Sequence, residues 1–215
     1  MLSNVYIISD DPRNHKDDEE FISNLLLVLH QTESLGSFIQ LRLKSLNGTE
    51  YETFLTKLNE RVVSQTLSSS SYTTRLLLNC AKPEELEIIF GLVKRFNFGG
   101  VHLTGISLEY LKSNPKIIES MANTKVIAAS CHNRSDLELS AQLGLSFVVL
   151  SPIKVSVTCP SEIQLGYDGF KKCVQGLGLH VYGLGGLSKE DIPHIVAIGG
   201  VGVAAIRSFW HEHQF

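Results

Sequence analysis

The 215-residue sequence has little proline and no long apolar run. Its 6 prolines exclude a long extended linker, and its 43% hydrophobic content excludes general disorder. No apolar run approaches the roughly 18 to 20 residues of a membrane-spanning helix. The opening segment MLSNVYIISDDPRNHKDDEE lacks a basic start and reaches acidic residues too early for an export signal. We therefore expect a cytoplasmic protein with no membrane partner.

Basic clusters and paired cysteines are absent as well. The formal net charge is -3, and the Lys and Arg residues are scattered, so no basic patch predicts a nucleic-acid partner. The cysteines, Cys80, Cys131, Cys159 and Cys173, are widely separated and form no CxxC pair. This spacing argues against a zinc ribbon or a redox pair and favours reduced thiols in a cytosolic compartment.

Short apolar segments alternate with longer amphipathic segments along the whole chain. The apolar segments predict strands at Val5–Ser9, Phe38–Leu41, Arg75–Leu78, Gly100–Leu103, Val126–Ala129, Phe147–Leu150, Val181–Gly183 and Val203–Ile206. The segments between them predict helices, because their apolar residues recur at helical spacing. These helices are expected at Asp17–Leu29, Tyr51–Leu67, Glu84–Phe96, Leu108–Leu111, Asp136–Leu143, Phe170–Val174 and Asp191–Ala197.

Eight strand–helix units in a chain of this length predict an α/β fold, a closed (β/α)8 TIM barrel that forms a single domain over residues 1–215. A doubly wound open sheet is the alternative, because counting elements separates the two architectures poorly. Only nine residues, 207–215, follow Ile206. The eighth helix is therefore expected to be short or missing.

Chemistry in such a barrel belongs at the C-terminal ends of the strands. The second strand continues as Gln40-Leu41-Arg42-Leu43-Lys44, which places Gln40, Arg42 and Lys44 on one side of an extended segment. Two cations and an amide at the mouth of a barrel suit an anionic substrate. A solvated strand end would produce the same pattern.

Two histidines lie on or beside predicted strands. His132 follows the fifth strand in Ser130-Cys131-His132-Asn133, where an imidazole is placed for acid–base chemistry near neutral pH. By spacing alone, a hydrogen-bonded structural role is the better explanation of His132. His102 lies inside an apolar strand, and a purely structural role is expected for it.

Glycines cluster near the last two strands. Gly185 and Gly186 follow the seventh strand, where backbone N–H groups of TIM barrels frequently bind a phosphate. The run Gly199-Gly200-Val201-Gly202 resembles a dinucleotide fingerprint. We reject that interpretation because the chain ends before the acidic residue that should follow about 20 residues later.

These segments, in their order and spacing, resemble the thiamine phosphate synthase/TenI superfamily of (β/α)8 barrels over nearly the whole chain. The segments that carry the resemblance are Val5–Ser9, Gln40-x-Arg42-x-Lys44, Asn79, Gly100–Leu103, Ser130-x-His132, Ser151-Pro152-Ile153 with Ser156 and Thr158, Leu165-Gly166, Val181–Gly186 and Gly202-Val203-Ala204. The superfamily has two main activities. The synthase joins a pyrimidine pyrophosphate to a thiazole phosphate and needs Mg²⁺, whereas the TenI-type thiazole tautomerase moves a proton without a metal.

The sequence departs from the synthase pattern at three positions that matter for its chemistry. Cys80 and Ser107 stand where the synthase has its two metal-binding carboxylates, and Cys159 stands where it has its pyrophosphate-binding lysine. A thiol and a hydroxyl cannot replace two carboxylates for a hard cation. The resemblance therefore implies a TenI-like thiazole tautomerase with no metal and no cofactor, and Mg²⁺ is expected only if the chain is a divergent synthase.

The resemblance also assigns residues to roles. His132 matches the acid–base histidine of the tautomerase. The substrate-binding positions are Gln40, Arg42, Lys44, Asn79, Ser130, Ser156 and Thr158, and the phosphate-binding positions are Gly185, Gly186, Ile206 and Arg207. The implied ligand is a small phosphorylated thiazole or a thiamine-related molecule, and a homodimer is compatible with the family.

Two alternatives to the tautomerase stay open. One is a divergent thiamine phosphate synthase, in which Asp10 and Asp11 could be invoked as substitute metal ligands. The other is a non-catalytic barrel that binds a thiamine-related phosphate.

Overall fold

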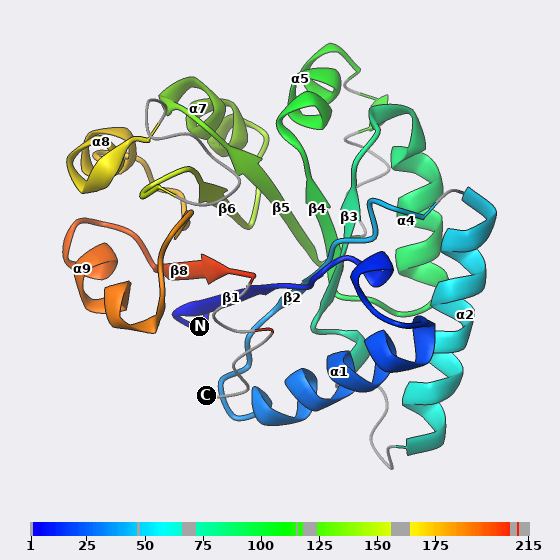
Figure 1. The fold of residues 1–215 in the computed structure, drawn as a ribbon. Coiled ribbons are helices and arrows are strands. Elements are labelled where there is room, and N and C mark those ends of the chain that lie inside the picture. Colours follow the sequence, from blue (N-terminus) through cyan, green and yellow to red (C-terminus); the bar gives the residue numbers. More distant parts are fainter. Residues whose placement is uncertain are drawn as a thin grey trace.

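The structure is a computed structural model that describes residues 2–46, 48–65, 72–114, 116–117, 124–155, 164–206 and 210. Its parallel strands form a closed barrel in chain order, because each strand pairs with the next and β1 pairs with β8 (Figure 1). The strands are β1 (Val5–Ile8), β2 (Ile39–Leu41), β3 (Leu76–Cys80), β4 (Gly100–Leu103), β5 (Val126–Cys131), β6 (Phe147–Leu150), β7 (Val181–Leu184) and β8 (Gly202–Ala205). The predicted TIM barrel is confirmed, and the open-sheet alternative is wrong.

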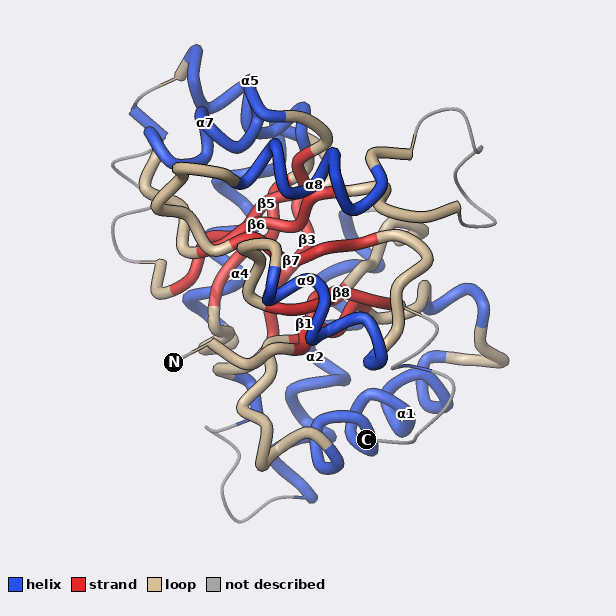
Figure 2. The backbone as a smooth tube through the Cα atoms, turned by 90° about the vertical axis from the view of Figure 1, so that its left-hand side faces the viewer, coloured by secondary structure: helices blue, strands red, loops and turns tan. Residues whose placement is uncertain are grey.

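Helices surround the barrel on the outside, as Figures 1 and 2 show from two directions. The α-helices are α1 (Asp18–Gln31), α2 (Gly48–Gln65), α4 (Leu86–Arg95), α5 (Gly105–Ser113), α7 (Arg134–Gln142), α8 (Gly166–Val174) and α9 (Ile192–Ala197). Short 3-10 helices lie at η1 (Pro12–Asn14), η2 (Pro83–Glu85) and η4 (Lys189–Asp191). Within the described residues, no helix combines the length and the apolar character that crossing a membrane requires.

Local sequence signals explain where several helices begin. The side chain of Asp17 accepts a hydrogen bond from the N–H of Glu20 at the start of α1. The side chain of Asn133 does the same for Asp136 at the start of α7. Such caps satisfy backbone donors that have no partner within the helix. They account for helix starts within one or two residues of the predicted positions.

The strands separate two apolar cores. The larger core lies between the strands and the helices and includes Phe21, Phe54 and Val101. A smaller core fills the inside of the barrel, and its buried members are Tyr6, Ile8, Leu77, Ala128, Phe147, Val149, Tyr182 and Ala204. Because both faces of each strand are covered, the strands are nearly continuous apolar runs in the sequence.

Gly202 belongs to this packing. A Cβ atom at Gly202 would lie 1.9 Å from the carbonyl oxygen of Asn4, on the segment that leads into β1. A glycine at this position therefore allows β8 to close against β1. This close approach of two backbones is a physical reason for a glycine at position 202, the last residue of the run at 199–202.

Trp210 lies after β8, in the part of the chain where the eighth helix of the barrel is expected. Its backbone N–H donates to the carbonyl of Ile206 over 2.9 Å, and its side chain is 1% exposed. The indole packs against Phe21 of α1, with ring centroids 5.3 Å apart. Among the described residues after β8, this single aromatic side chain covers the core.

Trp210→Ala is expected to lower the free energy of unfolding by about 3–5 kcal/mol, because it removes a large, fully buried aromatic side chain. Urea denaturation would measure this change. Ile88→Ala is the matched control, since Ile88 is 64% exposed and its loss should cost less than about 0.5 kcal/mol. Equal effects of the two substitutions would contradict the role assigned to Trp210.

Candidate functional site

Gln40 and Asn79 meet inside the barrel near its C-terminal end. Gln40 lies on β2 and Asn79 on the neighbouring β3, and both side chains are buried. The Nε2 of Gln40 donates to the Oδ1 of Asn79 over 3.0 Å. Burial of an amide requires such a partner. Two residues that the sequence placed in the site are thus brought together by neighbouring strands.

Ser130 joins a second polar group inside the barrel. Its Oγ lies 2.9 Å from the Nε2 of His102 on β4. The Nδ1 of His102 lies 2.9 Å from the hydroxyl oxygen of Tyr6 on β1. His102 is 1% exposed, and burial together with the charge of Lys44 lowers its pKa to about 3. The imidazole is therefore neutral at physiological pH.

Arg42 and Lys44 follow β2 where the chain leaves the barrel. The backbone N–H of Arg42 donates to the Oγ of Ser9 over 2.9 Å, which anchors this segment beside the end of β1. Desolvation and the nearby guanidinium of Arg42 lower the pKa of Lys44, and Asp11 opposes the shift. Within the described part of the chain, neither cation has a carboxylate at ion-pair distance. The two charges are available to an anion.

Lys44→Met is expected to weaken binding of thiazole phosphate about fivefold and to stabilise the fold slightly. A lowered pKa means that the ammonium is less favourable in the folded protein than in the unfolded chain. The resulting cost is fully present at neutral pH and disappears as the pH rises through the lowered pKa toward 10.5. Calorimetry and urea denaturation would measure the two effects.

Lys94→Met is the control for Lys44→Met, because Lys94 is an exposed cation on α4. It changes the net charge equally and should leave the affinity unchanged. If both variants bound thiazole phosphate equally weakly, net charge and not a local site would explain the result.

His132 is held by two backbone contacts at the end of β5. Its backbone N–H donates to the Oδ2 of Asp136 over 2.8 Å. Its ring Nδ1 lies 3.0 Å from the carbonyl oxygen of Ser151, and the Oγ of Ser151 is farther away at 3.4 Å. A carbonyl only accepts, so the neutral imidazole carries its proton on Nδ1 and donates it to Ser151. Within the described part of the chain, Nε2 has no hydrogen-bond partner, so its lone pair can accept a proton. A Cβ at Gly105 would lie 4.0 Å from the Cδ2 of this ring, so the glycine leaves space beside it.

Gly185 and Gly186 form a tight turn after β7. The carbonyl of Gly185 accepts from the N–H of Lys154 over 2.9 Å, which ties the turn to the segment after β6. Gly186 has a φ of +64°, and a Cβ there would lie 2.6 Å from the carbonyl oxygen of Val155. Among the described residues, the N–H groups of both glycines donate to no acceptor. Ile206, the other described phosphate-site residue, follows β8 and packs against the core inside the barrel.

A polar clamp holds this glycine turn in place, and it was not predicted from the sequence. The Nζ of Lys154 and the hydroxyl of Tyr167 both donate to the Oδ1 of Asp191, over 2.7 and 2.6 Å. Burial alone would raise the pKa of Asp191, but these hydrogen bonds outweigh it and lower the pKa to about 2. The capping box between Ser188 and Asp191 was the one local signal that could have pointed to this carboxylate.

The residues at the synthase metal positions do not fit Mg²⁺. Cys80 is fully buried on the outer side of the barrel, its Sγ donates to the carbonyl of Lys82, and burial raises its pKa to about 11. Ser107 is also buried, and its hydroxyl donates to the carbonyl of Cys80 over 3.4 Å. A protonated thiol and an engaged hydroxyl are poor ligands for a hard cation. No group of three His, Cys, Asp or Glu side chains suited to a metal occurs in the described ranges.

The carboxylates of Asp10 and Asp11 have structural partners. Asp10 accepts from the N–H of Asp11 and from the Nδ2 of Asn14, over 2.8 and 2.7 Å. Asp11 accepts from the N–H of Arg13 and from both the N–H and the hydroxyl of Ser45. These bonds order the loop after β1, and the pair does not form the open carboxylate site that a substitute magnesium centre would need. Four positions singled out in the sequence, Ser156, Thr158, Cys159 and Arg207, lie outside the described residues.

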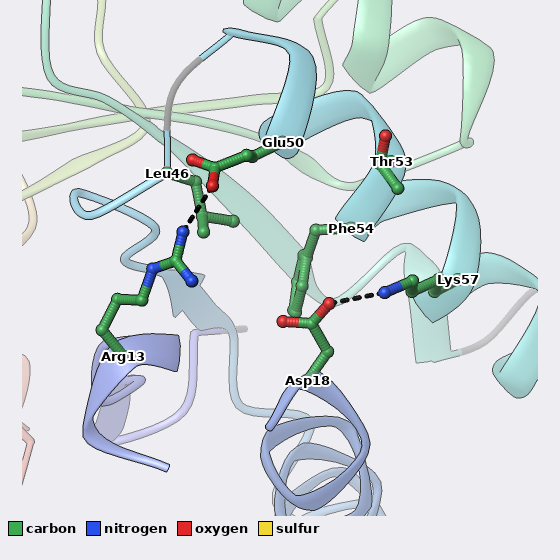
Figure 3. A pocket seen from close by; sticks show the side chains of 7 residues that line it. All are labelled: Arg13, Asp18, Leu46, Glu50, Thr53, Phe54 and Lys57. Carbon is green, nitrogen blue, oxygen red and sulfur yellow. Dashed lines mark hydrogen bonds and ion pairs between the residues drawn. The ribbon is translucent and has the colours of Figure 1, made fainter. Parts of the chain in front are cut away.

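A cavity of about 260 Å³ lies between the N-terminal parts of α1 and α2 (Figure 3). Two ion pairs cross it, from Arg13 to Glu50 at 2.5 Å and from Lys57 to Asp18 at 2.7 Å. None of the predicted site residues lines this cavity. The candidate site is therefore defined by the strand-end residues and not by this cavity.

Comparisons with known proteins show which protein family the chain matches. Residues 5–209 match the model of the protein family described as thiamine monophosphate synthase. The chain is 26% identical over 208 residues to a protein of Aquifex aeolicus (strain VF5) that is provisionally named thiamine-phosphate synthase 2, covering 97% of this chain and 98% of that protein.

Solved structures share the fold. A thiamine phosphate pyrophosphorylase from Pyrococcus furiosus superposes with a TM-score of 0.60 at 13% identity, covering 98% of this chain and 89% of that one. Another from Bacteroides thetaiotaomicron superposes with a TM-score of 0.58 at 19% identity, covering 98% and 86%. At these identities, the superpositions show the shared barrel alone.

Proposed function

Because this chain belongs to the thiamine monophosphate synthase family, we propose that it carries out the proton transfer of that superfamily as a metal-independent thiazole tautomerase. Its substrate would be a thiazole carboxylate phosphate that is not yet aromatic. The observation that carries the proposal is His132, whose Nδ1 contacts the carbonyl of Ser151 and whose Nε2 has no partner among the described residues. A fixed tautomer with one free basic nitrogen is what general base catalysis requires.

The proposed reaction needs only a positioned proton carrier and a held phosphate. The Nε2 of His132 would take a proton from the saturated ring carbon, and the imidazolium would return a proton at the other end of the conjugated system. The ring becomes aromatic and no bond to the phosphate changes. The backbone N–H groups of Gly185 and Gly186 would hold the phosphate, and Arg42 and Lys44 would attract the anionic ligand.

The chemistry of Cys80 and Ser107 supports the tautomerase over the synthase. Loss of pyrophosphate builds negative charge on the leaving oxygens, and the synthases of this superfamily use magnesium held by carboxylates to stabilise it. Here a buried thiol and a buried hydroxyl occupy those positions. Proton transfer within a thiazole develops no such charge on a leaving group.

The decisive experiment follows aromatisation of the thiazole tautomer by purified protein in the presence of EDTA. Acceleration that EDTA does not reduce would support the proposal. No acceleration, or acceleration that EDTA abolishes, would contradict it.

The name of the Aquifex aeolicus relative favours a divergent synthase as the second candidate. Magnesium-dependent formation of thiamine phosphate from the pyrimidine pyrophosphate and the thiazole phosphate would establish that function. No product at saturating Mg²⁺ would exclude it. Failure of both assays, together with calorimetric binding of thiamine phosphate, would indicate a binding protein.

A further inference from the structure

A chain of three hydrogen-bonded side chains runs through the inside of the barrel, and the proposed proton transfer does not use it. It connects Tyr6 on β1, His102 on β4 and Ser130 on β5 through two contacts of 2.9 Å. Tyr6 and His102 are each 1% exposed, whereas Ser130 is only partly buried at the mouth. The inside of a TIM barrel is ordinarily filled by branched apolar side chains, so this polar chain calls for a physical explanation.

Burial determines the direction of the first hydrogen bond. Desolvation raises the pKa of Tyr6 and lowers that of His102 to about 3, so both side chains are neutral at physiological pH. Within the described residues, the hydroxyl of Tyr6 has one acceptor, the Nδ1 of His102. If Nδ1 carried the proton, the O–H of Tyr6 would be a buried donor without an acceptor, which folded proteins avoid. Tyr6 therefore donates, and the single imidazole proton lies on Nε2.

The second hydrogen bond follows from the first. A protonated Nε2 donates to the Oγ of Ser130, so Ser130 acts as the acceptor in this pair. Its own O–H is then free to donate elsewhere, and Ser130 lies two residues before His132 at the same strand end. We propose that Tyr6 and His102 are positioning residues that orient the hydroxyl of Ser130 as a hydrogen-bond donor toward an acceptor atom of the bound ligand.

This inference rests on the proposed function only in placing the ligand at this mouth. It adds a rule about which ligands fit. A carboxylate oxygen or a ring nitrogen facing Ser130 completes the chain of hydrogen bonds. An amino group at the same point would offer no acceptor to the O–H of Ser130, so a ligand that places one there is disfavoured.

The tautomer of His102 can be measured without any ligand or turnover. In a long-range ¹H–¹⁵N spectrum of the ligand-free protein at pH 7, the resonances of His102 are identified by their absence from His102→Gln. We expect the pattern of a neutral imidazole with its proton on Nε2. A proton on Nδ1, or a charged ring, would overturn the proposal even if the protein proves to be a tautomerase.

Tyr6→Phe tests the coupling to the ligand, and Tyr182→Phe is its matched control. Tyr182 is 2% exposed inside the same barrel, but its hydroxyl donates to the carbonyl of Ser3 and not to His102. With the thiazole carboxylate phosphate as the calorimetric probe, Tyr6→Phe is expected to weaken binding about tenfold. Its His102 resonances should shift toward a mixture of tautomers. Tyr182→Phe should change neither measurement by more than about twofold.

A double-mutant cycle shows whether Tyr6 acts through Ser130. Ser130→Ala alone should weaken binding of the same probe about tenfold, because it removes the donor. Tyr6→Phe should then add no further loss in the Ser130→Ala background. Additive losses would show that Tyr6 supports the barrel only structurally, and they would overturn the proposal.

Discussion

Replacing His132 with alanine is expected to slow aromatisation of the thiazole tautomer by about 10² to 10⁴-fold, the usual contribution of a positioned acid–base group. The side chain is exposed, and among the described residues it forms hydrogen-bond contacts with Ser151 alone. The substitution should therefore leave the free energy of unfolding nearly unchanged. The rate constant at saturating substrate is the measurement, with urea denaturation run on the same preparations.

Two further variants separate chemistry from structure at His132. His132→Asn keeps a donor for the carbonyl of Ser151 but has no basic nitrogen, so it should be as slow as His132→Ala. His30→Ala removes an exposed histidine from the last turn of α1 and should leave the rate unchanged. A fast His132→Asn enzyme, or equal rates for wild type and His132→Ala, would end the assignment of His132 as the catalyst.

Gly186→Ala is expected to raise the KM for the phosphorylated substrate at least about tenfold. A Cβ at this position would lie 2.6 Å from the backbone oxygen of Val155, so the turn that presents the two N–H groups must shift. Hydrogen bonds to a charged phosphate are among the stronger ones, and losing one costs roughly a factor of ten or more. Steady-state kinetics and calorimetry with thiazole phosphate would both record the loss.

Gly144→Ala is the matched control for Gly186→Ala. Gly144 has a φ of +69°, close to that of Gly186, but a Cβ there would meet nothing within 4 Å. The left-handed backbone should cost each variant about 1 kcal/mol of stability, and Gly186→Ala should lose more because its Cβ also meets the backbone oxygen of Val155. Only Gly186→Ala should change KM. Equal KM values for the two variants would remove Gly186 from the phosphate site.

Much of the fold could be predicted from local sequence. The strands at Gly100–Leu103 and Phe147–Leu150 begin and end at the predicted residues. Other elements differ by one to a few residues at their ends, as for β5, which continues to Cys131. The predicted helix at Leu108–Leu111 begins earlier, at Gly105, because Thr104 caps it by accepting from the N–H of Ser107. Strand periodicity is local, whereas helix starts depend on individual caps.

The sequence predicted which positions belong to the candidate site, but it did not predict which of their side chains are hydrogen-bonded to one another. Gln40 and Asn79 were singled out separately, and only the adjacency of β2 and β3 makes them partners. His102 was expected to be purely structural, and its contacts with Tyr6 and Ser130 join segments that lie far apart in the sequence. The partners of a side chain at the mouth of a barrel depend on strand register, which no single segment specifies.

The sequence by itself determined the number and order of the strand–helix units and the absence of acidic side chains at Cys80 and Ser107, because periodicity and residue type are written along the chain. Closure of β8 onto β1 and the hydrogen-bond partners of His102 and His132 were decided only by the tertiary structure. Each depends on distances between atoms of remote segments, and those distances exist only once the barrel has closed.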